Sequence, residues 1–225
     1  MENGDLRTLA RDGAELYTGA ALADLSALHA MASAVPLDRA GVRLQGIAAL
    51  RPILETKGAI GLLAATVLGP GTRAVRAILF DKSAAANWSL GWHQDRTICV
   101  RDRADVPGFG PWTTKSGLHH VEPPFDILAR MVTLRVHLDD VPDTNAPLLI
   151  APGSHRLGRI PVAEVEATAR ASGVYRCTAT AGDVWMYATP ILHASEAAVT
   201  PTRRRVLQVD FANADLLAVL EWTGI

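Results

Sequence analysis

The sequence predicts a mainly β fold with helical support: a double-stranded β-helix, or jelly-roll, of the cupin-like barrel type, preceded by N-terminal helices. Two apolar stretches with helical spacing lie before residue 70, and many short runs of β-forming residues separated by turn residues follow residue 74. One of these runs, Met131 to Leu138, alternates between apolar and polar residues. Such alternation is typical of a strand with one dry and one polar face.

The N-terminal part is expected to be helical. The first predicted helix spans Gly19 to Val35, which is rich in alanine and leucine, and Pro36 ends it. The second spans about Thr56 to Leu68 and is closed by a Gly-Pro-Gly sequence through which a helix does not continue. Residues 1–70 should therefore support the barrel from outside.

The barrel strands are expected to start at Ala74 to Phe80. In the strand Met131 to Leu138, the polar row would point into the barrel cavity if the apolar row packs against the helices. Turn residues separate the further predicted elements, which are strands at Pro147–Ile150, Tyr175–Thr178, Asp183–Tyr187 and Arg205–Phe211 and a short helix at Val162–Ala171.

The chain of 225 residues is expected to form a single domain, 1–225, with its jelly-roll core at 74–225. Residues 102–125 contain three glycines and four prolines, which predicts a long loop within this core. Long loops in compact domains are commonly lids or binding loops.

Composition excludes some partners and indicates others. The formal charge of −1 gives no general reason to bind nucleic acid or an anionic membrane, so we expect a small-molecule substrate and a monomer or homodimer. Cys99 and Cys177 lack metal-type spacing and are expected to be reduced thiols. The N-terminus has no signal-peptide pattern and no stretch is long and apolar enough for a membrane span, which predicts a cytoplasmic protein.

Trp92-His93-Gln94-Asp95, followed far downstream by His193, supplies the residue types of a non-haem iron(II) site. A His-x-Asp match alone carries little weight, because about 0.5 such matches are expected by chance in a chain of this composition. A second pair, His137 and Asp139, also occurs. The first pair is preferred because four jelly-roll strands fit between Asp95 and His193, whereas they fit poorly after Asp139.

Three protein ligands on one face leave three open positions on iron(II), which can hold a bidentate 2-oxo acid and then O₂. The remote carboxylate of that acid needs a fixed partner, and an arginine fork is well suited to it. Arg204 lies eleven positions after His193, and Ser195 can add a hydroxyl donor.

Three further side chains are candidates for contacting the substrate. The alternation of the strand directs Thr133 and Arg135 at the cavity, where Arg135 could bind an anionic substrate or help to position the oxo acid. Trp112 flanks the site and could line a pocket, with ordinary packing as the alternative.

Three segments together resemble a known family: WHQD at 92–95, HLDDVPDTNAPLLIAPGSHRLGRI at 137–160 and AGDVWMYATPILHAS at 181–195. They are similar to the phytanoyl-CoA dioxygenase (PhyH) family of iron(II)/2-oxoglutarate-dependent oxygenases, from about Ala74 to Phe211. The resemblance implies iron binding by His93, Asp95 and His193. It also implies 2-oxoglutarate carboxylate contacts from Arg204 and Ser195. Halogenating relatives lack the carboxylate ligand, so Asp95 favours hydroxylation.

The sequence therefore predicts an iron(II)/2-oxoglutarate-dependent dioxygenase that uses O₂ as co-substrate to hydroxylate a small-molecule metabolite. One alternative is a cupin-type metalloenzyme, an isomerase or lyase that does not use 2-oxoglutarate. A second is a barrel that binds a small molecule without catalysis.

Overall fold

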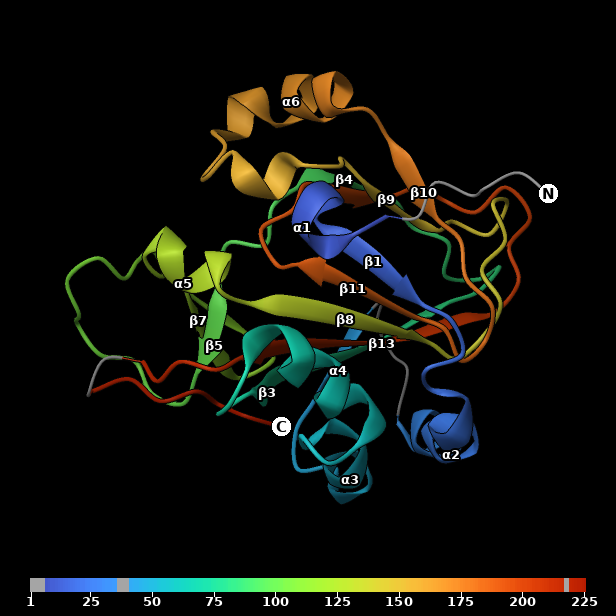
Figure 1. Ribbon diagram of the computed structural model, residues 1–225, viewed down its shortest axis with the longest axis horizontal. Helices are drawn as coiled ribbons and strands as arrows, with labels where there is room; N and C mark the ends of the chain where they lie inside the picture. The colour runs from blue at the N-terminus through green and yellow to red at the C-terminus, as the bar shows by residue number, and fades with distance from the viewer. Residues whose placement is uncertain (1–6, 36–40, 217–218) are drawn as a thin grey trace.

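The computed structural model describes residues 7–35, 41–216 and 219–225. Its largest sheet has six antiparallel strands in the order β1-β11-β8-β13-β3-β2 (Figure 1). These strands are β1 (Ala14–Tyr17), β2 (Gly41–Leu44), β3 (Arg73–Lys82), β8 (Val132–His137), β11 (Val184–Ala188) and β13 (Arg204–Ala212).

A second sheet faces the first and has the order β10-β9-β12-β4. Its strands are β4 (Leu90–His93), β9 (Leu148–Ile150), β10 (Tyr175–Cys177) and β12 (His193–Ser195). Trp185 and Tyr187 of the main sheet pack with Ile150 and Cys177 of the second sheet in one buried apolar cluster. Two facing antiparallel sheets of this kind form the predicted jelly-roll, which confirms the fold class.

Helices cover the outer face of the main sheet. They are α2 (Leu25–Ala34), α3 (Arg51–Leu54) and α4 (Ala59–Leu68), which lie together on one side of it (Figure 1). Leu28 and Ile60 from these helices share the largest apolar cluster with Leu134 and Leu207 from the sheet. The outer face is therefore dry, as the sequence predicts.

The remaining helical elements are short. They are α1 (Leu9–Asp12), α5 (Phe125–Ala129) and α6 (Val165–Ser172), with single 3₁₀ turns at Leu22–Asp24, Ala48–Leu50, Ser154–Arg156 and Val162–Glu164. The predicted helices at 19–35, 56–68 and 162–171 thus correspond to α2, α4 and α6, whereas Pro36 lies outside the described residues. Among the described residues, no helix combines the length and apolarity needed to cross a membrane.

The opposite face of the main sheet is polar and lines the barrel interior. On β8, Thr133, Arg135 and His137 are all less than 10% exposed and lie on the face away from the helices. On β13, Gln208 pairs with Arg135 and Asp210 pairs with Thr133, so the polar row continues across the sheet. This confirms the predicted polar row.

Two predictions about the chain's organisation need correction. Residues 1–70 are not only helical, because β1 and β2 form the two outer strands of the main sheet. Residues 102–125 are not simply a loop, since β6 (Trp112–Lys115) and β7 (Leu118–Val121) form a hairpin that joins β5 (Ile98–Val100). A turn at Ser116 and Gly117, both with positive φ, closes the hairpin. Strands of four residues are too short to show an alternating pattern, and glycines and prolines around them favoured the loop interpretation.

Candidate metal centre

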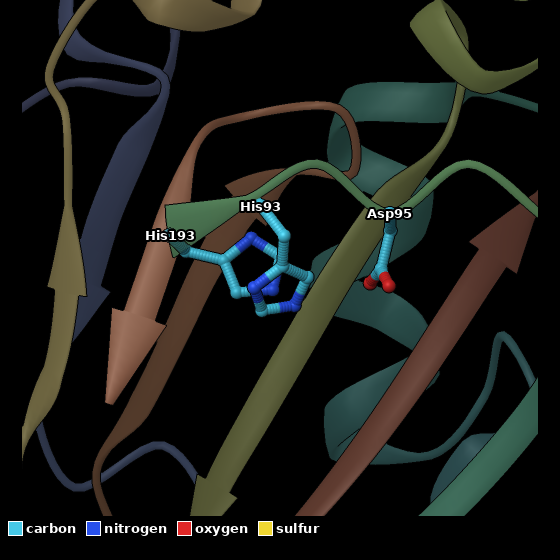
Figure 2. A group of neighbouring side chains, drawn as sticks. All are labelled: His93, Asp95 and His193. Atoms are coloured by element: carbon cyan, nitrogen blue, oxygen red, sulfur yellow. The ribbon is translucent and has the colours of Figure 1, made fainter. Parts of the chain in front are cut away.

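His93 and His193 come together from two neighbouring strands of the second sheet. His93 ends β4, His193 begins β12, and the two residues are direct partners in the antiparallel ladder. Their ring centroids lie 4.2 Å apart (Figure 2). Residues 100 positions apart in the sequence are therefore neighbours because of the strand pairing alone.

Both imidazole rings are oriented by the same local hydrogen bond. The Nδ1 of His93 lies 2.8 Å from the carbonyl oxygen of Gly91, and the Nδ1 of His193 lies 2.9 Å from that of Ile191. A carbonyl oxygen only accepts, so each Nδ1 carries a proton and Nε2 is the ring nitrogen left to bind a metal. This is the tautomer that a metal-ligating histidine needs.

Asp95 completes a group of three metal-binding side chains. One ligand atom from each of His93, Asp95 and His193 lies within 4.8 Å of the others. Asp95 follows the end of β4, on the segment that Figure 2 shows beside the two rings. Gln94 fixes this segment, because its amide donates to the carbonyl of Pro190 at 2.9 Å and accepts from the backbone N–H of Ile160 at 2.9 Å.

An arginine holds Asp95 in its ionised form. The Oδ2 atom of Asp95 is buried without a hydrogen-bond partner among the described residues, and lies 3.5 Å from Nη2 of Arg76. Arg76 also donates from Nε to Asp210 at 2.5 Å. Burial raises the pKa of Asp95, but the charge of Arg76, followed by the two histidines, outweighs it and lowers the pKa overall.

The donor set fits a divalent transition metal. Burial and then the neighbouring His93 lower the pKa of His193 to about 4, so its ring is neutral at physiological pH. Two imidazoles that present Nε2 and one carboxylate with a buried oxygen that accepts no hydrogen bond among the described residues form the 2-His-1-carboxylate arrangement of iron(II) sites. The buried oxygen is otherwise costly, which a bound cation would relieve.

The three side chains line a cavity of about 180 Å³. Its other lining groups are mostly cationic or apolar, and include Arg43, Arg76, Ile78, Phe80, Lys82, Trp88, Leu90, Lys115, Arg135, Leu148, Ser195, Arg204 and Gln208. Among the described residues, Asp95 is the only carboxylate that lines this cavity.

Arg204, Ser195 and Lys82 form one corner of this cavity. Arg204 is 2% exposed; it donates to the carbonyl of Ala146, and its buried Nε has no partner in the described part of the chain. Lys82 pairs with Arg204 across the β3–β13 ladder and donates from Nζ to Ser195 Oγ at 2.9 Å. The sequence predicted Arg204 and Ser195 as contacts of a 2-oxoglutarate carboxylate, but it did not indicate Lys82.

Burial sets the charges of this corner. Burial, and then the charges of Arg204 and Arg135, lower the pKa of Lys82 to about 7. Burial and then Arg135 lower the pKa of Arg204 to about 9, so its guanidinium stays charged at neutral pH. A charged arginine beside a lysine that is charged below about pH 7, with no carboxylate between them among the described residues, favours the binding of an anion.

The three predicted substrate contacts have different outcomes. Arg135 lines the cavity and donates from Nη1 to Gln208 Oε1 at 2.9 Å. Thr133 is fully buried and donates to Asp210 at 3.0 Å, so its position does not support a direct substrate contact. The position of Trp112 does not support one either, because the ring packs on the apolar cluster next to β5 and β7 and is absent from the cavity lining.

The competing pair is not assembled as a metal site. Asp139 is bound by Arg205, with the Nη2 to Oδ1 distance at 2.7 Å. His137 is 1% exposed and neither of its ring nitrogens has a partner among the described residues. Burial, followed by Arg135 and Arg204, lowers its pKa well below the usual range, so it is a neutral, buried residue that does not line the cavity.

The fold and this cluster define a class: jelly-roll proteins with two histidines and one carboxylate gathered at the cavity. The sequence model of the phytanoyl-CoA dioxygenase (PhyH) family matches residues 62–206. The chain therefore belongs to this family, which confirms the resemblance predicted from the sequence. No curated protein matches the chain in sequence.

Solved structures with the same fold share little sequence with the chain. The epimerase SnoN from nogalamycin biosynthesis, solved with Fe³⁺, alpha ketoglutarate and nogalamycin RO, has a TM-score of 0.66 at 18% identity, covering 92% of this chain and 81% of that chain. EctD from S. alaskensis, solved with 2-oxoglutarate and 5-hydroxyectoine, has a TM-score of 0.62 at 15% identity, covering 94% of this chain and 78% of that chain. AviO1 from Streptomyces viridochromogenes Tue57 has a TM-score of 0.59 at 21% identity, covering 91% of each chain.

Proposed function

We propose that the protein is an iron(II)/2-oxoglutarate-dependent oxygenase that hydroxylates a small-molecule metabolite. One observation carries the proposal: the cluster of His93, Asp95 and His193 and the cationic corner at Arg204 line the same small cavity. Membership of the PhyH family supports it. So do the solved relatives SnoN and EctD, whose structures contain iron or 2-oxoglutarate.

The side chains divide the work between the two ends of the cavity. His93, Asp95 and His193 would hold iron(II) through Nε2, a carboxylate oxygen and Nε2, and leave the cavity side open. Arg204 and Ser195 would bind the remote carboxylate of 2-oxoglutarate through hydrogen bonds, and Lys82, which already donates to Trp88, Ser195 and Glu196, would attract it by its charge. When bound, iron(II) with 2-oxoglutarate and O₂ supplies the oxidising power for attack on an unactivated C–H bond.

The surrounding residues keep these groups in place and dry. Arg76 fixes the charge and direction of Asp95, and Gln94 fixes the backbone between His93 and Asp95. Ile78, Phe80 and Leu148 make part of the cavity lining apolar, which would limit the access of water to the reaction. Hydroxylation is proposed as the outcome because the carboxylate ligand is intact. Relatives of this fold include an epimerase and a carbocyclase, so the product must be identified directly.

The experiment is 2-oxoglutarate-dependent succinate release with iron(II), followed by product analysis under ¹⁸O₂. His93→Ala and Asp95→Ala should lower turnover by more than about 100-fold, and His29→Ala on α2 is the matched histidine control. Arg204→Ala should raise the KM for 2-oxoglutarate, whereas Arg203→Ala should not, because Arg203 is bound to Asp81 outside the cavity. Absence of succinate release in the wild type would favour the metal-dependent isomerase or lyase instead.

A further inference from the structure

A chain of buried polar contacts runs from the candidate metal ligand Asp95 across the main sheet. Arg76 on β3 lies 3.5 Å from Asp95 and donates to Oδ2 of Asp210 on β13 at 2.5 Å. The other oxygen of Asp210 accepts a hydrogen bond from Thr133 on β8 at 3.0 Å, and the hydroxyl of Thr133 lies 3.0 Å from that of Thr189. Apart from Asp95, the members of this chain of contacts are less than 10% exposed.

The direction of each hydrogen bond follows from Asp210. Both of its oxygens accept, one from a guanidinium and the other from a hydroxyl, which is the pattern of an ionised carboxylate. The single hydroxyl proton of Thr133 therefore points at Asp210, and Thr189 donates to Thr133. Two neighbouring strands, β3 and β8, thus fix the Asp210 carboxylate from both sides.

The chain of contacts ends beside the segment that carries the second histidine ligand. Thr189 lies in the turn before β12, four residues ahead of His193. The next residue, Pro190, accepts a hydrogen bond from the Gln94 amide at 2.9 Å. Because Gln94 lies between the other two ligands in the sequence, the contacts form a closed ring that links both ligand-bearing segments.

Within this ring, Arg76 lies between two carboxylates and is shared unequally. It makes its close hydrogen bond to Asp210 and only a longer charge contact to Asp95, whose Oδ2 accepts no hydrogen bond from the described residues. An arginine without Asp210 to hold it would be able to form a close, bidentate pair with Asp95. Such a pair would occupy the carboxylate oxygens that a metal ion needs.

We propose that Asp210 is a positioning residue for the metal centre. It keeps Arg76 at a distance from which the arginine orients Asp95 without competing with the metal for it. Thr133 supports this role by holding the Asp210 carboxylate in place. The inference rests on one part of the proposed function, the binding of a metal by the three ligands, and it does not depend on 2-oxoglutarate or on the product.

A double-mutant cycle on manganese(II) affinity, followed by electron paramagnetic resonance, tests this proposal. Asp210→Asn should weaken binding about tenfold, because Arg76 is released to pair with Asp95. In the Arg76→Gln background the same substitution should change the affinity by less than about twofold, because the arginine through which Asp210 acts is gone. The matched control is Asp12→Asn, which alters a buried carboxylate that pairs with Arg11 outside the cavity and should bind as the wild type does.

Thr133 offers a milder test that removes no buried charge. Thr133→Val removes the hydroxyl and keeps the shape, and it should weaken manganese(II) binding about threefold or more. Thr133→Ser keeps the donor and should bind within about twofold of the wild type. The matched control is Thr72→Val, at a buried hydroxyl that donates to Gly69 outside the ring of contacts.

The outcomes separate this proposal from the proposed function. Equal losses from Asp210→Asn in both backgrounds would show that its charge acts on the metal through space, and the proposal would be wrong. Wild-type affinity in folded Asp210→Asn would also overturn it. If Asp210→Asn does not fold, the threonine variants decide, and equal affinities of Thr133→Val and Thr133→Ser would contradict the proposal. A wild type that binds no manganese(II) would defeat both proposals, whereas metal binding without succinate release would defeat the proposed function alone.

Discussion

His93 and His193 face each other directly across the β4–β12 ladder, with their ring centroids 4.2 Å apart. Each ring is fixed by a hydrogen bond to the carbonyl two residues before it, at Gly91 and Ile191. Because backbone atoms do the orienting, the two Nε2 atoms are set once the strands pair. The metal site is therefore largely pre-formed by the sheet, and its third ligand depends on a different support.

That support is Arg76, which bridges Asp95 and the buried Asp210. Arg76→Lys keeps the charge but loses the planar fork, and we expect manganese(II) affinity to fall about tenfold. Arg76→Gln loses both the charge and the fork, and it should lower the manganese(II) affinity about 100-fold. Manganese(II) titration monitored by electron paramagnetic resonance measures both. Equal affinity in the wild type and in folded Arg76→Gln would show that Arg76 does not position the carboxylate.

Lys82 predicts a pH dependence for 2-oxoglutarate binding. Burial lowers the pKa of Lys82 to about 7, and its charged form binds a carboxylate better than the neutral amine does. Affinity should therefore be flat below about pH 7 and should fall as the pH rises above it, by up to about tenfold per unit. Calorimetry between pH 6 and 9 measures this. Lys82→Met should bind more weakly at pH 6 and show no fall near pH 7; a fall of the same size would assign the dependence to another group.

The same lysine affects the stability of the ligand-free protein. The unfolded chain keeps the proton of Lys82 up to its ordinary pKa of 10.5, but the folded protein keeps it only up to about 7. Unfolding takes up a proton between these values, so the free energy of unfolding should rise with pH in this window. Urea denaturation at several pH values should show a smaller rise in Lys82→Met than in the exposed control Lys57→Met. Identical slopes would contradict the lowered pKa.

Leu134 tests how the helices hold the main sheet. It is fully buried on the helix side of β8, opposite the polar row that lines the cavity. Leu134→Ala should lower the free energy of unfolding by about 2–5 kcal/mol, because it leaves a cavity in the largest apolar cluster. Leu62→Ala on α4, where the leucine is 55% exposed, should change it by less than about 0.5 kcal/mol. A similar decrease in the free energy of unfolding in both variants would show that Leu134 does not belong to the main core.

Much of the fold could be predicted because long periodic segments carry a clear signal. The alternation at Met131 to Leu138 predicted both the dry face and the polar face of β8, and the helical periodicity predicted α2 and α4. Strands of three or four residues, such as β4 and β12, contain too few positions for a pattern. The pairing of these short strands nevertheless brings the two histidines together.

The candidate site likewise contains residues that could be predicted from the sequence and residues that could not. His93, Asp95 and His193 could be chosen from their residue types and from the number of strands that fit between them. Lys82 and Arg43 could not, because their places in the cavity depend on the registers of β3 against β13 and of β2 against β3. Thr133 was predicted to face the interior and does, but Asp210 and Thr189 occupy its hydroxyl. The alternating sequence pattern predicts on which face of the sheet a side chain lies, but it does not predict its hydrogen-bond partner.

Anaerobic titration with iron(II) tests the central claim most directly, because it measures the metal site without requiring a substrate. We expect the wild type and the control His29→Ala to bind one iron(II) per chain, and His193→Ala and Asp95→Ala to lose at least about 100-fold in affinity. Binding of iron(II) with unchanged affinity by either ligand variant would contradict the account.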